Sequence, residues 1–310
     1  MIYKYSTINT KKKFDGGLDE MDYYDRIQSA IDFIELNLNE NINITKIASK
    51  AFFSAFHFQR IFQAISGFSV QEYIRKRRLT EASILLLKTD KTILEIADVF
   101  QYGSQEAFTR AFESYFGVTP AKYRRMKEES KNLLKKINLR DFERKIQGEI
   151  KIDRPNIIDM NKTYIYGYEY ITNINKEKYF EEIPRFYDDF DRNEYYMRIP
   201  KRVSPAFPYG ISCNYMEDGQ FSFIVGEAIK QSMESIESGF LCVEIPEGKY
   251  AEFKVRGSVE IAQNTWRYIY GTWLLNSNYE RREGPDFEVT DVCNSAYPDR
   301  MAMKIYIPIE

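Results

Sequence analysis

The side chains best suited to specific chemistry occur twice in this sequence, at a constant separation of 50 residues. The stretch SAFHFQRIFQAISG begins at Ser54, and the stretch SQEAFTRAFESYFG begins at Ser104. Arg60 in the first stretch and Arg110 in the second hold equivalent positions. Because arginine, glutamine and threonine side chains can hydrogen-bond to base edges in the major groove of DNA, the repeat predicts two copies of one base-reading element.

Each stretch has the spacing of an amphipathic helix. Apolar residues recur at i, i+3, i+4 and i+7 in both copies. The residues expected to face inward are Phe58, Ile61, Phe62 and Ile65 in the first copy and Phe108, Ala111, Phe112 and Tyr115 in the second. Those expected to face outward are Phe56, Gln59, Arg60 and Gln63 in the first copy and Glu106, Thr109, Arg110 and Glu113 in the second. A serine, Ser54 or Ser104, stands where the N-cap of each helix is expected.

A shorter helix is expected before each copy, and the two shorter helices also match. Their equivalent residues, offset by 49, are Ile44, Ile47 and Ala48 and then Ile93, Ile96 and Ala97. A short helix, a tight turn and a helix with a polar outer face make a helix-turn-helix. Two plain helices of an all-helical bundle would also show polar faces. The matched caps, cores and arginines favour DNA binding, as does the local charge of 14 Lys/Arg against 7 Asp/Glu over residues 41–127.

The length and composition limit the class of protein. A chain of 310 residues exceeds the usual size of one hydrophobic core, so two domains are expected. No apolar run approaches the roughly 20 residues that a membrane span requires, and the first residues lack the apolar core of a signal peptide. Three cysteines far apart in the sequence are typical of a reducing compartment. The sequence therefore favours a cytoplasmic protein with no membrane partner.

The character of the sequence changes along the chain and predicts how it divides. Residues 1–20 are predicted to be a flexible arm, residues 21–127 a helical domain whose longest helix covers 70–88, and residues 128–159 a charged linker. Residues 160–310 are predicted to form an α+β domain, with helices near 176–192 and 259–275. Its β-prone runs are residues 164–170, 219–226, 240–245, 250–255 and 301–307.

The helical part resembles the AraC/XylS-type transcription regulators over about 105 residues. The shared pattern runs through IASKAFFSAFHFQRIFQAISG and TILEIADVFQYGSQEAFTRAFESYFG to the ending FGVTPAKYRR. The resemblance implies that two recognition helices enter successive major-groove segments, about 34 Å or one DNA turn apart, with the 70–88 helix setting their separation. The residues that it places at bases or nearby backbone are Phe56, Gln59, Arg60, Gln105, Glu106, Thr109 and Arg110, and those that it places at phosphates are Lys122, Arg124 and Arg125.

Residues 160–310 are acidic and rich in aromatic side chains. They hold 17 Lys/Arg against 24 Asp/Glu, and 27 aromatic residues, of which 16 are tyrosine. Tyrosine combines a flat apolar ring with a hydroxyl group, and aromatic rings beside a carboxylate can hold an organic cation. This composition favours a cationic ligand over an anionic one.

The same part resembles the GyrI-like effector-binding domains of multidrug-responsive regulators, through an ordered series of pieces from FPYGIS to the terminal KIYIPI. The resemblance implies two β-α-β-β halves around a shared cleft, in which Glu288 pairs with lipophilic cations. Glu280 is a second candidate carboxylate, and Trp273 matches a tryptophan that the family carries on a helix. The residues that would complete an aromatic wall, although core packing explains each equally well, are Tyr168, Phe207, Tyr209, Phe223 and Tyr270.

Together these features predict a DNA-binding transcriptional regulator, an activator, that responds to a small cationic or lipophilic effector. RNA polymerase is an expected partner, the expected state is a monomer or weak homodimer, and no cofactor or metal is expected. Two alternatives stay open, a hydrolase domain tethered to DNA with Glu288 as its base, and a DNA-bound protein scaffold without a small ligand. An enzyme is not expected, because the only histidine, His57, lies in the helical part and cannot activate a nucleophile in the second domain.

Overall fold

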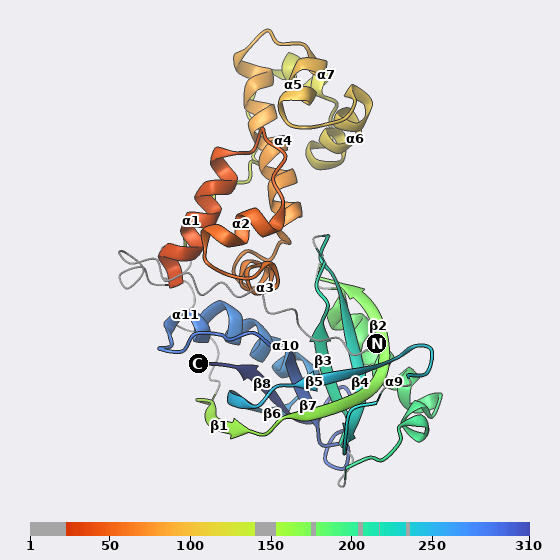
Figure 1. Ribbon diagram of the computed structural model, residues 1–310. Coiled ribbons are helices and arrows are strands. Elements are labelled where there is room, and N and C mark those ends of the chain that lie inside the picture. Colours follow the sequence, from red (N-terminus) through yellow and green to blue (C-terminus); the bar gives the residue numbers. More distant parts are fainter. Residues whose placement is uncertain (1–22, 140–152, 175–177, 204–206, 217, 234–235) are drawn as a thin grey trace. The chain divides into compact units, whose positions relative to one another are not determined.

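The computed structural model describes residues 23–139, 153–174, 178–203, 207–216, 218–233 and 236–310. These residues form two compact units, a helical one from the first part of the chain and one built on a sheet from the second. Figure 1 shows the helical unit in red to yellow and the sheet unit in green to blue. The arm predicted for residues 1–20 lies outside the described residues.

The helical unit consists of two helix-turn-helix pairs, α2–α3 and α5–α6, together with a long helix between them (Figure 1). The long helix, α4, covers the residues predicted for it. The helices are α1 (Tyr23–Leu36), α2 (Ile44–Lys50), α3 (Ala55–Ser66), α4 (Val70–Lys88), α5 (Ile93–Val99), α6 (Gln105–Phe116) and α7 (Pro120–Met126).

Local sequence signals fix the ends of the two repeated helices, α3 and α6. The Ser54 hydroxyl accepts a hydrogen bond from the backbone N–H of His57 at 3.2 Å, and the Ser104 hydroxyl accepts one from Ala107 at 3.1 Å. Both helices end at a glycine, Gly67 or Gly117, with φ of 71° and 74°. Glycine adopts this left-handed conformation without a steric penalty, which is why it closes helices. The two predicted N-caps are confirmed.

The inward faces of α3 and α6 supply much of the core of the helical unit. The predicted inward residues are buried at Phe58, Ile61, Phe62, Ile65, Phe108 and Phe112, and half-buried at Ala111 and Tyr115. Around α6, the core also takes in Leu86 of α4, Ile96 of α5 and Tyr123 of α7. The second helix-turn-helix is therefore packed directly on the long helix.

The chain does not leave the helical unit at residue 127, where the predicted linker begins. Residues 130–139, which we call the strap, return along α7, α4 and α1. The backbone N–H of Ser130 donates to the Tyr123 hydroxyl at 2.8 Å, and that of Leu134 donates to the Thr80 hydroxyl at 3.2 Å. The next contacts of this kind run from Ile137 to the Tyr73 hydroxyl and from Leu139 to Gln28, at 3.3 and 3.0 Å. Side chains of the helices thus accept hydrogen bonds from backbone N–H groups of the strap. Buried and half-buried backbone groups need such partners.

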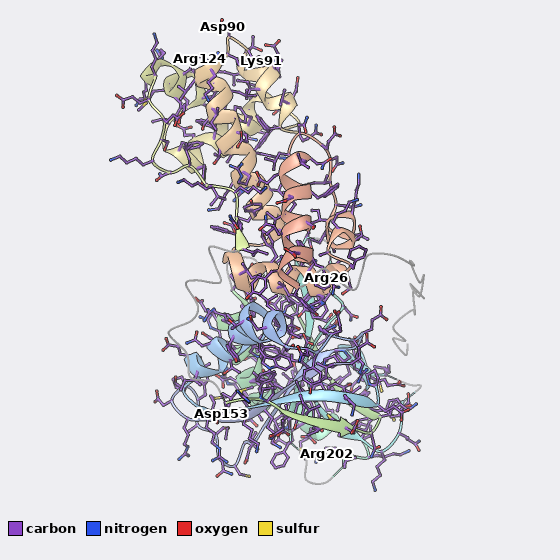
Figure 2. The ribbon with its side chains drawn as sticks, turned by 90° about the vertical axis from the view of Figure 1, so that its left-hand side faces the viewer. Arg26, Asp90, Lys91, Arg124, Asp153 and Arg202 are labelled. Atoms are coloured by element: carbon purple, nitrogen blue, oxygen red, sulfur yellow. The ribbon has the colours of Figure 1, made fainter. Side chains whose placement is uncertain are left out.

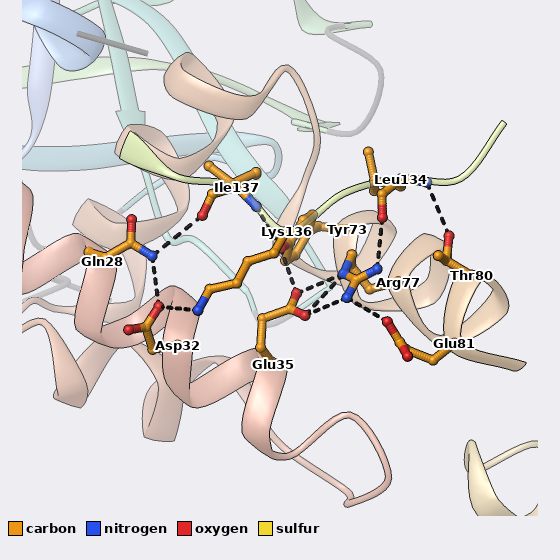
Figure 3. A network of polar contacts seen from close by, with 10 residues as sticks. All are labelled: Gln28, Asp32, Glu35, Tyr73, Arg77, Thr80, Glu81, Leu134, Lys136 and Ile137. Atoms are coloured by element: carbon orange, nitrogen blue, oxygen red, sulfur yellow. Dashed lines mark hydrogen bonds and ion pairs between the residues drawn. The ribbon is translucent and has the colours of Figure 1, made fainter. Parts of the chain in front are cut away.

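A buried ion pair joins the strap to two of the helices (Figure 3). Arg77 of α4 donates to both carboxylate oxygens of Glu35 of α1, at 2.7 to 3.0 Å, and to Glu81 at 2.7 Å. Its remaining nitrogen donates to the carbonyl of Leu134 in the strap at 2.7 Å, and Tyr73 donates to Glu35 at 2.6 Å. Since the side chains of Arg77 and Glu35 are only 9% and 11% exposed, one guanidinium holds α1, α4 and the strap together.

The sheet unit is built on one antiparallel sheet whose eight strands run in the order β1-β6-β8-β7-β3-β4-β2-β5. The strands are β1 (Asn156–Met160), β2 (Thr163–Asn173), β3 (Tyr209–Cys213), β4 (Gln220–Ile229), β5 (Phe240–Ile245), β6 (Gly248–Gly257), β7 (Asp286–Thr290) and β8 (Met301–Pro308). The helices are α9 (Tyr179–Arg192), a 3₁₀ turn (Tyr195–Arg198), α10 (Val259–Tyr268), a π-helical turn (Ile269–Trp273) and α11 (Leu274–Asn276).

These elements make the two predicted β-α-β-β halves. One half is β2-α9-β3-β4, the other is β6-α10-β7-β8, and the pairing of β3 with β7 joins them. The five predicted β-prone runs fall on β2, β4, β5, β6 and β8. The prediction missed β1, β3 and β7, which have five residues each, too few to show an alternating pattern. In particular, β1 begins within the residues predicted to be linker and ends one residue beyond them.

The sheet must curl strongly, because two short connections join strands that are far apart in its order. Met160 of β1 and Thr163 of β2 are three residues apart, as are Ile245 of β5 and Gly248 of β6. Three Cα steps reach about 11 Å, whereas six strand spacings would span about 29 Å in a flat sheet. One apolar cluster contains residues of strands at both ends of the order, among them Val243, Ile158 and Phe287. The inside of the curl is therefore a packed core.

The outer face of the curl carries the two long helices of the unit. Phe186 and Phe190 of α9 pack on Phe223 and Val225 of β4. On β7, Phe287 and Val289, which are two residues apart, both belong to the apolar cluster inside the curl. Because side chains alternate between the two faces of a strand, Glu288 lies on the outer face, close to the centre of the sheet.

Candidate DNA-reading helices and effector site

The second candidate reading helix, α6, presents a polar outer face. Gln105, Glu106, Arg110 and Glu113 are exposed, and Thr109 is half-buried. Glu106, Thr109, Arg110 and Glu113 were predicted to face outward, and the family resemblance added Gln105 to the residues expected at DNA. Arginine and glutamine can each address a base edge with two hydrogen bonds, so this face can read base pairs.

The first candidate reading helix, α3, has a different outer face. Phe56 and Arg60 are half-buried, and the Arg60 guanidinium carbon lies 5.9 Å from the centre of the Phe56 ring. Gln59 and Gln63, predicted to face outward, are only 3% and 5% exposed, in contrast to Thr109 and Glu113 at the equivalent positions. The repeat thus keeps its arginine in both copies but differs in its other polar side chains.

The two helix-turn-helix pairs share their turn geometry. Phe52 in the first turn and Gln101 in the second both have positive φ, 57° and 63°. The carbonyls of Ala51 and Phe52 in the first turn accept hydrogen bonds from Arg26, at 3.0 and 3.3 Å. Helix α4 connects the pairs, and its 19 residues give a rod about 28 Å long. This length is close to the 34 Å or so that separates successive major-groove segments on one face of DNA.

The basic residues at the end of the helical unit fall into two groups. Lys122 and Arg125 of α7 are exposed. Arg124 donates to the carbonyl of Leu86 at 3.0 Å and to that of Lys91, and Figure 2 shows Arg124 and Lys91 side by side. These bonds satisfy carbonyls at the end of α4 and in the loop that follows it. Arg124 therefore has a structural function, whereas Lys122 and Arg125 stand where a phosphate could reach them.

His57 has no access to a substrate. Its side chain is 4% exposed, and its ring lies 4.5 Å from the ring of Phe53 and 6.1 Å from that of Tyr23. It packs among aromatic rings at the base of the first helix-turn-helix.

In the sheet unit, Glu288 is the centre of a polar group between the two halves. It is 7% exposed and pairs across the strands with Gly210 of β3. The Tyr187 hydroxyl, from α9, donates to one carboxylate oxygen at 3.0 Å, and the Trp266 indole N–H, from α10, donates to the other at 3.2 Å. One helix of each half thus reaches the same carboxylate.

Glu288 lies in a closely packed environment, and its negative charge affects the neighbouring Tyr187. Burial raises the pKa of the Tyr187 hydroxyl well above its usual value, and the negative charge of Glu288 raises it further. A side chain at Gly210 would clash with the Tyr187 hydroxyl and the Phe223 ring, so this position on β3 needs a glycine. Tyr187 is therefore a neutral donor at ordinary pH.

Two further buried side chains, Tyr270 and Arg281, form hydrogen bonds with Asp286 of β7, beside Glu288. Tyr270, in the π-helical turn, donates to Asp286, which lies two residues from Glu288 on the same face of β7. Arg281 donates to Asp286 at 2.8 Å, and both side chains are almost fully buried. A π-helical turn changes the direction of the side chains that follow it, and here the residues around it reach β7.

The predicted ligand residues lie in several environments. Phe223 is buried and its ring centre is 5.9 Å from that of Tyr187, so it belongs to the Glu288 group. Tyr270 joins this group through Asp286 and by stacking on Trp266, with ring centres 6.5 Å apart. Tyr209 is half-buried at the opposite face, where its ring lies 5.9 Å from that of Phe287. Burial raises its pKa.

The remaining predicted residues lie apart from the contacts of Glu288. Tyr168 stacks on Tyr195 with ring centres 4.1 Å apart. Trp273 packs edge-on against Phe253 at 5.0 Å. Glu280 is exposed and its backbone pairs with that of Glu310, and Phe207 is half-buried two residues before β3.

Two of the residues that contact Glu288 were not predicted from the sequence. Trp266 and Tyr187 were not among the predicted ligand residues, and Trp273 was chosen as the helix tryptophan. A helical repeat could have pointed to Trp266, because it lies one turn before Tyr270 on the same side of the helix. Tyr187 gave no such signal among the many aromatic residues of α9.

Two possibilities can be examined within the described residues. In this part of the chain, no group of three or more His, Cys, Asp or Glu side chains could hold a metal ion. Among the helices that the structure describes, none is long and apolar enough to span a membrane.

Comparison with known proteins identifies both units. Residues 47–126 match a family described as a helix-turn-helix domain, and residues 156–309 match one described as an integron-associated effector binding protein. The second match includes β1, which confirms that the sheet unit begins within the predicted linker.

Relatives cover both the whole chain and its helical part. The right origin-binding protein of Escherichia coli K12 is 27% identical over 301 residues, which are 93% of this chain and 99% of the relative. The transcriptional regulator Rob of Salmonella typhimurium is 27% identical over 276 residues, 86% of this chain and 91% of the relative. The probable transcription factor PqrA of Proteus vulgaris is 47% identical over 90 residues, 29% of this chain and 74% of the relative. The chain therefore belongs to the AraC-type transcriptional regulators, with a DNA-binding helix-turn-helix unit followed by an effector-binding unit.

Proposed function

We propose that α3 and α6 read two successive major-groove segments of one DNA site, and that a single chain does so without a second copy. The observation that carries this proposal is the outer face of α6, where Glu106 and Arg110 are exposed within a repeated helix-turn-helix. The first turns of such a helix approach the bases. The side chains proposed to contact DNA are Phe56, Gln59 and Arg60 from α3, Gln105, Glu106, Thr109 and Arg110 from α6, and Lys122 and Arg125 at phosphates.

Two of these positions need comment. Gln59 is 3% exposed, so a base contact by Gln59 requires that its side chain become exposed on binding. Arg124 is already bonded to two backbone carbonyls, and we therefore propose that Lys122 and Arg125 make the phosphate contacts and that Arg124 supports them.

The test of DNA reading is the Arg110→Ala variant. Loss of a guanidinium that grips a base should weaken binding to the preferred site by about 1–3 kcal/mol. Binding to unrelated DNA should fall far less. Arg192→Ala is a matched control, since it removes the same charge from a side chain that is 74% exposed on α9. A footprinting titration in which Arg110→Ala binds the preferred site as well as the unaltered protein would contradict the proposal.

We further propose that the effector is a lipophilic organic cation and that it binds at Glu288. The carboxylate is buried, and the Tyr187 hydroxyl and the Trp266 indole N–H, which donate to it, are uncharged groups. A buried carboxylate with neutral donors gains stability from a cationic partner. The rings of Trp266, Tyr187 and Phe223 add cation–π attraction.

Calorimetry with rhodamine 6G, a lipophilic cationic dye, tests this site. Glu288→Gln should abolish binding, because it removes the charge and keeps the shape of the side chain. Glu283→Gln is the control, since Glu283 is exposed and was not among the predicted ligand residues, so its loss should leave binding unchanged. Equal affinity of the dye for Glu288→Gln and the unaltered protein would remove Glu288 from this role.

We also propose that the sheet unit acts as a sensor and not as an enzyme, and that the DNA-bound protein activates transcription by contacting RNA polymerase. The family relationship supports the regulator, and the burial of His57 supports the absence of a histidine base. Incubation with lipophilic esters and with cationic dyes, followed by a search for reaction products, distinguishes a sensor from an enzyme. Product formation that is lost in Glu288→Gln would identify a hydrolase.

A further inference from the structure

The two reading helices carry the same arginine but a different side chain one turn before it. Four residues before Arg60, α3 has Phe56, and four residues before Arg110, α6 has Glu106. Residues i and i+4 lie on the same side of a helix. In α6 both members of the pair are exposed, and in α3 the guanidinium of Arg60 lies 5.9 Å from the Phe56 ring centre. Each pair therefore presents its two side chains in one direction.

A carboxylate such as that of Glu106 is selective in the major groove. It is repelled by phosphates and by the acceptor atoms of guanine, adenine and thymine, and it is attracted to an amino group. Cytosine presents the N4 amino group and no acceptor of its own in this groove, whereas the amino group of adenine lies beside the N7 acceptor. A glutamate on the reading face thus favours cytosine and rejects the other bases.

The aromatic ring of Phe56 has the opposite chemistry. It offers no hydrogen bond, and its favourable contact in the major groove is with the C5-methyl group of thymine. Both arginines favour guanine, through its O6 and N7 atoms. One helical turn advances about 5.4 Å, and neighbouring bases are about 3.4 Å apart. The two bases read by each pair are therefore one or two positions apart.

We propose that Phe56 and Glu106 are specificity-determining residues that give the two half-sites different base content. The half-site of α6 holds a cytosine, read by Glu106, one or two positions from the guanine of Arg110. The half-site of α3 holds a thymine at the equivalent position, next to the guanine of Arg60. This inference rests on the proposed DNA-reading function.

The test is a selection of preferred sequences from randomised duplex DNA by the full chain, followed by binding measurements on the selected site. Arg110→Ala first identifies the half-site of α6 by the loss of one guanine. Glu106→Gln should then change the neighbouring cytosine to adenine, the base that glutamine pairs with, by roughly tenfold in relative affinity. Phe56→Gln should change the thymine of the other half-site to adenine, while Phe56→Leu, which stays apolar, should retain thymine.

The control is Glu113→Gln, which removes the same charge from an exposed residue in the last turn of α6. It should strengthen binding to all sequences by a similar factor and leave base preference unchanged. Helical circular dichroism of each variant checks that it is folded. A clear motif that Glu106→Gln leaves unaltered would overturn the assignment while DNA reading stands, and so would an equal effect of Glu113→Gln. Absence of any motif for the unaltered protein would overturn the proposed function itself.

Discussion

Substitution of Arg77 should unfold the helical unit at a lower denaturant concentration and leave the sheet unit unchanged. Arg77 makes hydrogen bonds to Glu35, Glu81 and the carbonyl of Leu134, and its side chain is 9% exposed. In Arg77→Ala, the carboxylate of Glu35 stays buried. Of its hydrogen bonds drawn in Figure 3, only the one from the Tyr73 hydroxyl remains. Removing one partner of a buried pair costs about 3–5 kcal/mol, because the other charge is left uncompensated.

The two units allow a measurement with an internal control. Both tryptophans, Trp266 and Trp273, lie in the sheet unit, so tryptophan fluorescence follows that unit while circular dichroism at 222 nm is dominated by the helical one. In a urea titration, Arg77→Ala should lower the midpoint of the circular dichroism transition and leave the fluorescence transition in place. Arg75→Ala is the matched control, since Arg75 is exposed on the same helix and surface changes usually stay within about 0.5 kcal/mol.

A double variant distinguishes the effect of an uncompensated charge from the effect of lost packing. Replacement of both Arg77 and Glu35 by methionine should restore most of the lost stability, because replacing a buried ion pair by apolar side chains of similar volume is often neutral or stabilising. If Arg77→Ala unfolds at the same urea concentration as the unaltered protein, the ion pair does not hold the helices. If the double variant is as unstable as Arg77→Ala, the loss comes from packing or from the strap, and not from an uncompensated charge.

Three further variants test other parts of the structure. Gly210→Ala should destabilise the sheet unit by about 1–3 kcal/mol through overpacking, since its Cβ would clash with Tyr187; thermal unfolding followed by fluorescence measures this. Ser104→Ala should cost about 1 kcal/mol through loss of the α6 N-cap, and an unchanged helical transition would argue against the cap. Burial alone would raise the pKa of Glu252, but hydrogen bonds, first that from Lys304, outweigh it and hold the pKa below its usual 4.5. Because a depressed folded-state pKa gives stability above the unfolded value that is lost as pH falls through the folded one, Glu252→Gln should flatten the acid side of the stability–pH curve.

The helical unit was well predicted from the sequence because its signals are local. The N-caps Ser54 and Ser104 and the inward phenylalanines of both repeats follow from the spacing alone, and the long helix has the predicted bounds. The exposure of Gln59 was predicted wrongly. Position on a helical wheel gives the side of the helix on which a residue lies, and does not give what covers that side. The strap was also missed, because its bonds to Thr80 and Gln28 join residues more than 50 positions apart.

In the sheet unit, the sequence predicted the class of fold and the central carboxylate better than the contacts around it. Strands of five residues, such as β7, have too little alternation to be recognised without a family pattern. Glu288 was found through the GyrI-like resemblance, which the comparison with known families supports. The choice of Trp273 in place of Trp266 as the nearby tryptophan came from a linear match, whereas the hydrogen bond depends on the direction in which α10 and its π-helical turn aim their side chains.

The short connections from β1 to β2 and from β5 to β6 limit how far the sheet of the sheet unit can open. Each link can reach at most about 11 Å, so the two ends of the strand order stay close together and the sheet cannot flatten while its strands keep their register. The effector proposed for Glu288 would have to displace Tyr187 or Trp266, which both donate to the carboxylate. Since Tyr187 and Trp266 belong to different halves, displacing either would break one of the contacts that link the halves through Glu288, while the bond from Gln263 of α10 to the Phe180 carbonyl of α9 would remain.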